Sequence, residues 1–108
     1  MATRQSIITY LLDQIGSLQN VRTRKMFGEY CIYVEEKPTA FVCDDELFVK
    51  PTEAGRAKIG TPELGQPYPG AKPHFWITAD RWDDRAWLCD LLAATADALP
   101  MPKPRVRR

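Results

Sequence analysis

The sequence predicts an α+β domain in which helices pack against one antiparallel sheet. Apolar runs of strand length alternate with turn-forming residues between residues 24 and 51, a pattern typical of an antiparallel meander. Segments with apolar residues at helical spacing stand before and after that stretch. The predicted order is an N-terminal helix, a four-strand meander, a short helix, a fifth strand and a C-terminal helix. The chain has 108 residues, so residues 1–100 fit one domain with one core.

The first helix is predicted over residues 4–15. Thr3 is the expected N-cap and Gly16 the expected C-terminal stop. Its buried face should carry the apolar residues that recur at helical spacing, namely Ile7, Ile8, Leu11, Leu12 and Ile15.

The four strands of the meander follow as apolar, β-rich segments. They are expected over residues 21–28, 30–34, 40–43 and 47–50. Gly28 should occupy a hairpin corner or bulge, because glycine tolerates tight backbone conformations. The remaining turns are predicted at residues 35–38 and at Asp44 and Asp45, whose side chains can hydrogen-bond to the nearby backbone.

The second half of the chain predicts a short helix, a long loop, one strand and a closing helix. Thr52 should cap a helix that runs to Ile59, although Gly55 lowers its propensity by about 1 kcal/mol. Residues 60–73 contain three glycines and four prolines, which predict a loop. Loops this long within a compact domain often have a function. The fifth strand is expected over residues 74–78. The last helix should begin near Asp80 or Asp83 and bury Leu88, Leu91, Leu92, Thr95 and Leu99.

A basic, proline-rich tail is predicted over residues 101–108. Prolines 100, 102 and 104 should end the helix and keep the tail extended. The net charge of the whole chain is +1. Four cations lie in the tail, so the rest of the chain is mildly acidic; they are Lys103, Arg105, Arg107 and Arg108.

Composition and cysteine use argue against export, membrane insertion and metal binding. Cys31, Cys43 and Cys89 are odd in number and far apart, which suits neither a disulfide framework nor a zinc site. No apolar stretch reaches the roughly 18 residues of a membrane span, and the N-terminus lacks the apolar region of a secretion signal. We therefore expect reduced thiols, a cytoplasmic location, and no cofactor or metal.

No catalytic residue is predicted. His74 is the sole histidine, and the two serines, Ser6 and Ser17, stand in no nucleophile motif. We interpret His74 as a structural or surface strand residue. The acidic run at residues 44–46 could form a cation site, but adjacent carboxylates at a hairpin tip are more simply turn residues that face water. These observations favour a protein that is not an enzyme.

The long loop suggests a ligand groove. Tyr68, Lys72, His74 and Trp76 could form a shallow surface that combines stacking with charge. Such a groove would suit a small-ligand binding protein or a cryptic enzyme. The alternative is that Tyr68 and Trp76 fill the core while Lys72 is solvated.

A second basic cluster suggests nucleic-acid contact. Arg22 and Arg24 should share one face of a strand, with Lys25 next to them. Together with the tail they could neutralise about four phosphates, which predicts a log–log salt slope near −3.6. The alternative is a solvated strand edge and a solubilising tail.

Three motifs carry a resemblance to a known family. They are the run Lys25-Met26-Phe27-Gly28-Glu29-Tyr30, the paired segments Phe41-Val42 and Leu47-Phe48-Val49-Lys50, and a last helix rich in Trp and Leu. Over residues 10–99 the chain resembles the N-terminal domain of the TfoX/Sxy competence-regulator family. The resemblance implies an α+β fold with an antiparallel sheet, and no catalytic residues.

The resemblance also implies a regulatory role. Full-length members are similar to transcriptional co-regulators that act with the cyclic-AMP receptor protein on genes for natural DNA uptake. The leading hypothesis is therefore a cytosolic regulatory module that binds a protein partner, with optional contact to nucleic acid. A homodimer through an edge strand or the aromatic sheet face is a further expectation.

Overall fold

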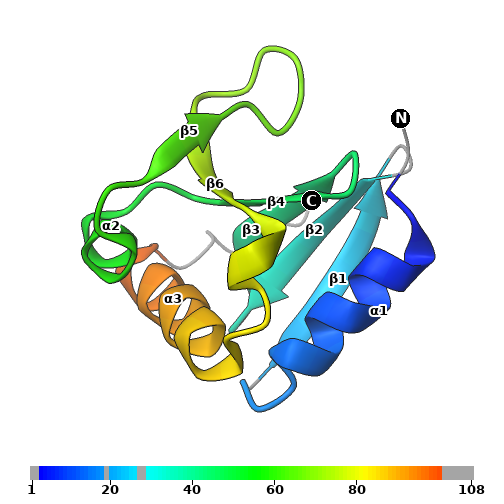
Figure 1. The fold of residues 1–108 in the computed structure, drawn as a ribbon, viewed down its shortest axis with the longest axis horizontal. Helices are drawn as coiled ribbons and strands as arrows, with labels where there is room; N and C mark the ends of the chain where they lie inside the picture. Colours follow the sequence, from blue (N-terminus) through cyan, green and yellow to red (C-terminus); the bar gives the residue numbers. More distant parts are fainter. Residues whose placement is uncertain (1–2, 19, 27–28, 101–108) are drawn as a thin grey trace, which may run out of the picture.

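The computed structural model describes residues 3–18, 20–26 and 29–100 of the chain. These residues form helices that pack on one antiparallel sheet (Figure 1), which confirms the predicted α+β class. In chain order the elements are α1 (Gln5–Gln14), β1 (Val21–Met26), β2 (Glu29–Val34), β3 (Lys37–Cys43), β4 (Glu46–Val49), α2 (Glu53–Ile59), β5 (Glu63–Gly65), β6 (His74–Ile77), the 3₁₀ helix η1 (Ala79–Arg81) and α3 (Arg85–Ala98).

The sheet has the strand order β1-β2-β3-β4-β6-β5, with every neighbouring pair antiparallel. The first four strands form the predicted meander. The prediction of a continuous loop over residues 60–73 is wrong, because Glu63–Gly65 form the additional strand β5. Leu64 in β5 is 58% exposed, so this strand is held by backbone pairing with β6 rather than by an apolar face.

Two hairpin turns of the meander place both central residues at positive φ. The angles are 53° and 67° at Glu35 and Glu36, and 52° and 64° at Asp44 and Asp45. Such two-residue turns match the twist of the flanking strands. The first turn is therefore shorter than the predicted 35–38, and Pro38 belongs to β3. Pro38 lies at a shift in register, where its missing N–H costs little.

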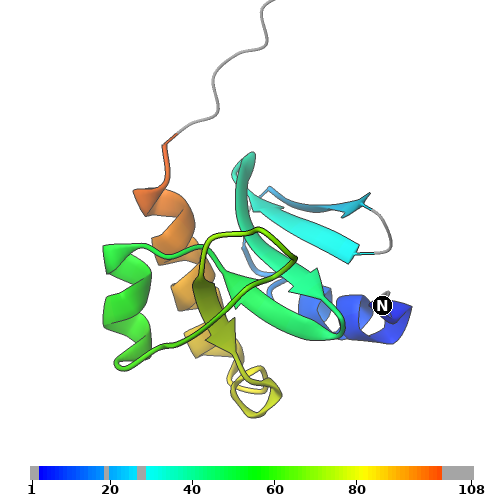
Figure 2. The ribbon, with the colours of Figure 1, turned by 90° about the horizontal axis from the view of Figure 1, so that it is seen from above.

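Helices α1 and α3 cover the same face of the sheet (Figures 1 and 2). Alternate residues of the strands point toward these helices and are buried, including Ile32, Val42 and Leu47. The helices, together with the C-cap of α1, contribute the buried residues Ile8, Leu11, Ile15, Leu88, Leu91 and Leu92. Among the described elements, no helix lies on the opposite face, which we call the helix-free face (Figure 2).

Helix α1 begins without the predicted cap. Its N-cap is Arg4, which makes no capping hydrogen bond through its side chain, and Thr3 is used in long-range contacts instead. The helix ends at Gln14, with Ile15 as its C-cap, so Gly16 lies directly after the cap, the position at which glycine commonly ends a helix.

The other two helices have side-chain caps. Thr52 caps α2 as predicted, since its Oγ1 accepts a hydrogen bond from the N–H of Gly55 at 2.9 Å. Helix α3 is capped by Asp84, which accepts from the N–H of Trp87 at 3.1 Å, rather than by Asp80 or Asp83. In the part of the chain that the structure describes, no helix is both long and apolar enough to span a bilayer.

The C-terminal end of α3 is tied to the sheet by a lysine. Lys37 Nζ donates to the carbonyl oxygen of Ala96 at 2.8 Å. Carbonyl groups in the last turn of a helix have no partner within the helix, so a nearby cation stabilises them. The predicted stripe is buried from Leu88 to Thr95, while Leu99 is the half-buried C-cap.

We predict that Gly55→Ala destabilises the protein although alanine is the better helix former. A Cβ atom at Gly55 would lie 2.9 Å from Thr95 Oγ1 and 3.0 Å from Thr52 Oγ1, both closer than normal contact. Overpacking of this kind costs about 1–3 kcal/mol, which exceeds the gain in propensity of about 1 kcal/mol. Urea denaturation measures the difference. Combining the change with Thr95→Ala should recover part of the loss, and a G55A protein more stable than the wild type would contradict the prediction.

Candidate functional site

The helix-free face combines aromatic, cationic and thiol side chains. Strand alternation and register place these side chains together: Arg22, Arg24, Cys31, Tyr33, Phe41, Cys43, Phe48, His74 and Trp76. Cys31, Cys43 and Phe48 are buried even though no described helix covers them. Tyr33 and Phe41 are half-buried, so their rings are partly open to solvent.

A pocket of about 440 Å³ opens on this face where the loop before β6 crosses the sheet. The ring of Phe41 meets Tyr68 and His74 edge to face, with centroid distances of 6.1 and 5.5 Å. Lys50 and Lys72 supply the cations, and the described residues that line the pocket include no carboxylate. We call it the basic-aromatic pocket; its lining is Phe41, Lys50, Pro51, Tyr68, Gly70, Ala71, Lys72 and His74.

Hydrogen bonds within the loop hold the wall of this pocket. The N–H of Ala71 donates to the carbonyl oxygen of Tyr68 at 3.0 Å, and Gln66 Nε2 donates to that of Ala71 at 2.8 Å. Gly70 has a φ of +87°, which a side chain would disfavour. His74 Nδ1 lies 2.7 Å from the carbonyl oxygen of Lys72. Because a carbonyl oxygen only accepts, Nδ1 is the donor of this hydrogen bond.

The predicted groove residues are only partly brought together. Tyr68, Lys72 and His74 line the basic-aromatic pocket, whereas Trp76 lies two residues further along β6, opposite Phe48, and is not part of the lining. Tyr68 is 51% exposed, so it does not fill the core. A role of these residues in ligand binding stays a prediction.

Sequence reasoning missed the two lining residues that come from the meander. Phe41 lies on β3, and Lys50 directly follows β4. Both belong to the predicted hairpin, and strand alternation opposite the buried Val42 and Val49 could have assigned them to the outer face. What the sequence could not show was that the loop at residues 60–73 returns over this hairpin.

The predicted basic cluster divides between the two faces of the sheet. Arg22 lies on the helix-free face, with its guanidinium 4.3 Å from the ring centroid of Tyr33 and 3.1 Å from a carboxylate oxygen of Glu36. Arg24 shares that face, as predicted from alternation. Lys25 points to the other side, where its Nζ lies 6.0 Å from the centroid of Tyr30.

Several predicted residues lie outside the described part of the chain. These are the tail over residues 101–108 with its cations Lys103, Arg105, Arg107 and Arg108, and Phe27 and Gly28 of the corner between β1 and β2. Their predicted roles stay predictions.

The cysteines are buried free thiols. Burial raises the pKa of the Cys31 thiol, and burial together with the nearby Glu29 carboxylate raises the pKa of Cys43 to about 11. Cys89 lies on the helix side, where its Sγ donates to the carbonyl oxygen of Gln14. Because the thiolate is the reactive form, Cys31 and Cys43 are poor nucleophiles at neutral pH.

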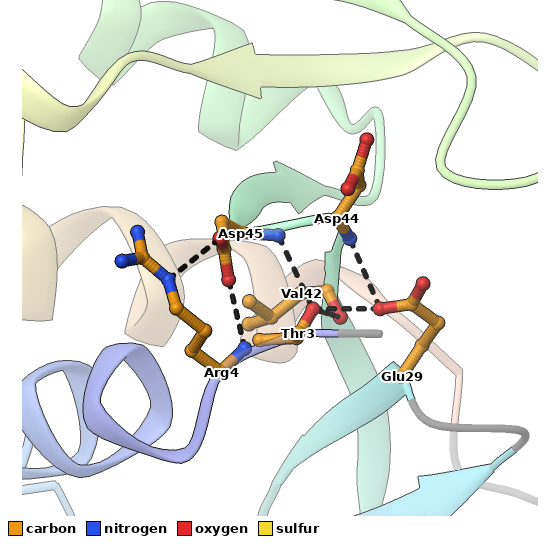
Figure 3. Close-up of polar contacts among 6 residues, drawn as sticks. All are labelled: Thr3, Arg4, Glu29, Val42, Asp44 and Asp45. Atoms are coloured by element: carbon orange, nitrogen blue, oxygen red, sulfur yellow. Dashed lines mark hydrogen bonds and ion pairs between the residues drawn. The ribbon is translucent and has the colours of Figure 1, made fainter. Parts of the chain in front are cut away.

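The acidic turn holds the N-terminal segment against the sheet (Figure 3). The carboxylate of Asp45 accepts from the N–H of Arg4 at 2.8 Å and from Arg4 Nε at 2.9 Å. Thr3 Oγ1 donates to the carboxylate of Glu29 at 2.6 Å and accepts from the N–H of Asp45 at 3.3 Å. The backbone N–H of Asp44 donates to the same Glu29 carboxylate at 3.0 Å.

This network corrects the expectation that the acidic run simply faces water. Asp44 is exposed, but Asp45 is half-buried and paired with Arg4, and Glu46 belongs to β4 rather than to the turn. Within residues 3–18, 20–26 and 29–100, no group of three or more His, Cys, Asp and Glu residues is placed to hold a metal ion.

Comparison with known proteins identifies the family. A family model for the TfoX N-terminal domain matches residues 13–99. The chain belongs to the TfoX N-terminal domain family. This TfoX N-terminal domain is also 48% identical over 105 residues to an uncharacterized 12.7 kDa protein in the trpE 5′ region of Spirochaeta aurantia. That match covers 97% of this chain and 90% of the relative. The family resemblance predicted from the sequence is confirmed.

We predict that Asp45→Asn lowers stability at neutral pH and that its effect shrinks in acid. The N–H of Arg4, and then its guanidinium, hold the pKa of Asp45 below its usual 3.8. A carboxylate with a lowered pKa in the folded state stabilises the protein above its ordinary pKa, and this stabilisation is lost as the pH falls through the lowered value. Urea midpoints at about pH 7 and at about pH 3, just below the ordinary pKa, test for the onset of this loss.

Asp44→Asn is the matched control, because it removes the same charge from the same turn. The carboxylate of Asp44 makes no hydrogen bond to the described residues; only its backbone N–H does. The control should therefore change the midpoint less than D45N at neutral pH. Equal effects of the two substitutions, or a D45N effect that stays constant into acid, would contradict the assignment.

Proposed function

We propose that this TfoX N-terminal domain is a non-enzymatic regulatory module of transcription or DNA uptake that acts by binding, with the helix-free face as its binding surface. One observation carries the proposal. The helix-free face leaves the rings of Tyr33, Phe41 and Tyr68 partly exposed beside cations, whereas the opposite face is packed under α1 and α3. Exposed aromatic surface is unfavourable by about 25 cal/mol per Å², so its concentration on one face favours an interaction site.

The states of the reactive side chains also support binding rather than catalysis. The thiols of Cys31 and Cys43 have raised pKa values and are buried. The Nδ1 of His74 is committed to the carbonyl oxygen of Lys72, and the carboxylate of Asp45 is paired with Arg4. A general base or nucleophile must lie within hydrogen-bond reach of a substrate or of a catalytic partner. The hydrogen bonds of His74 and Asp45 are instead made to groups that hold the fold together.

A regulatory role predicts that deleting the gene in its own host changes a defined set of transcripts. Expression of the wild-type chain should restore those transcripts. The double variant Tyr68→Ala/Lys72→Ala, which removes an exposed ring and an exposed cation from the pocket, should not restore them.

Lys58→Ala is the matched control, because it removes an exposed cation from α2 on the helix side of the molecule. RNA sequencing of the five strains, namely the parent, the deletion strain and the three complemented strains, provides the readout. A deletion strain with unchanged transcripts, or full restoration by the double variant, would overturn the proposal.

A further inference from the structure

The aromatic side chains of the helix-free face are spaced along a path across the sheet. Tyr33 lies on β2, Phe41 on β3 and Tyr68 in the loop that crosses above β4. Phe41 pairs with Cys31, two residues from Tyr33, and its ring centroid is 6.1 Å from that of Tyr68. Neighbouring strands are about 4.8 Å apart, so the path spans a few strand widths. This length matches a few consecutive bases of a nucleic-acid strand.

Cations accompany the rings along the same path. Arg22 stacks over Tyr33 with its guanidinium carbon 4.3 Å from the ring centroid, and Arg24 lies next along β1. Lys50 and Lys72 stand at the other end, in the basic-aromatic pocket. Arg22 also pairs with Glu36 at the hairpin tip, but that contact is exposed and therefore weak. Rings alternating with cations suit a ligand that presents aromatic groups and regularly spaced negative charges.

An acidic depression sets a limit to this path. On the far side of Tyr68 a second hollow is lined by Glu29, Asp44 and Glu46. Tyr68 lines both hollows, so it stands at the boundary between the basic and the acidic surface. A polyanion would be favoured from Arg22 to Lys72 and repelled beyond Tyr68, which restricts the ligand to a short segment.

The geometry favours a single strand over a duplex. In a duplex the bases are stacked inside the helix, so the rings of Tyr33, Phe41 and Tyr68 would meet no base. Single strands can turn their bases outward onto aromatic side chains of an open sheet. The volume of the basic-aromatic pocket, about 440 Å³, lies within the range of small-ligand sites and suits one nucleotide unit.

We propose that the helix-free face binds single-stranded nucleic acid, with bases stacked on Phe41, on Tyr68 and on the Arg22 guanidinium that lies over Tyr33, and with phosphates contacted by Arg24, Lys50 and Lys72. This proposal rests on the proposed function, because it assigns a ligand to the same face. The chemistry is shared by RNA and single-stranded DNA, so the experiment uses both.

The test is fluorescence anisotropy of the full chain with labelled oligouridylate and oligodeoxythymidylate of about 10 nucleotides, and with a duplex of equal length. We expect at least one of the single strands to bind at least about 10-fold more tightly than the duplex. Binding should weaken with salt, and Lys50→Gln/Lys72→Gln should reduce the log–log slope by about 1.4, the value for two phosphates on a single strand.

Variants of Tyr68 separate stacking from general charge attraction. Tyr68→Leu keeps an apolar side chain but removes the ring, and should weaken binding roughly 5- to 150-fold, the range for one stacked base. Tyr68→Phe keeps the ring and should bind like the wild type. Lys58→Ala, on the helix side, should leave the affinity unchanged. Circular dichroism of each variant verifies that the fold is retained.

Three outcomes would overturn the proposal: no binding of either single strand, a duplex bound as tightly as the single strands, or a Tyr68→Leu protein that binds like the wild type. Such a result would leave the proposed function standing if Tyr68→Ala/Lys72→Ala still failed to restore transcripts in the host. Conversely, oligonucleotide binding with unchanged transcripts would reject the regulatory role and keep the ligand assignment.

Discussion

The separation of the sheet into two faces is the constraint on which the rest of the structure depends. Successive side chains of a strand point to opposite sides, so each strand of the meander contributes one set of residues to the helices and another to the outer face. On the helix side, Ala40, Val42 and Val49 are fully buried. A shift of register by one residue would exchange the two sets, because the side-chain period is two. The apolar residues of the meander therefore determine both the core and the composition of the helix-free face.

The second half of the chain completes this arrangement through close backbone contacts. Gly55 lets α2 approach α3 at Thr95, and Trp82 donates its indole N–H to the carbonyl oxygen of Ile77 at 2.9 Å. The first contact packs α2 against α3, and the second ties Trp82 to the end of β6. Gly65 of β5 lies against the ring of Phe48, where a Cβ atom would come within 2.9 Å. The loop between β5 and β6 is thereby held over the outer face, where it forms the wall of the basic-aromatic pocket.

Most elements that could be predicted from the sequence bury a periodic set of apolar residues; α2 is the exception, because it buries only Gly55 and is indicated by its Thr52 cap. The meander, α1 and α3 fall into this class, since their patterns extend over several turns or several strands. Strand β5 could not be predicted, because Glu63 and Leu64 are exposed and its stability comes from pairing with a distant strand.

The caps of the helices show the same limit of prediction from sequence. Three aspartates precede α3 within five residues, and the one that caps it is Asp84, whose carboxylate accepts from the N–H of Trp87. Threonine is a residue type that favours N-cap positions, yet the hydroxyl of Thr3 hydrogen-bonds to Glu29 and Asp45, which are distant in sequence.

The candidate site likewise combines residues that local sequence could group with residues that only distant pairing brings together. Tyr68, Lys72 and His74 are close in sequence and could be grouped from it, whereas Phe41 and Lys50 join them through the register of β3 and β4 and through the path of the loop. The outer face buries Cys31, Cys43 and Phe48 without a described helix above them, so the loop and the neighbouring rings take over the role that α1 and α3 play on the other side. The loop does not cover Phe41 and Tyr33 completely, so these two side chains are half-buried between Arg22 and Lys72. Covering them fully would stabilise the sheet, because transfer of apolar surface out of water is favourable. An open, cation-flanked aromatic strip beside an otherwise covered sheet is therefore more consistent with a surface kept for a ligand than with an unfinished core.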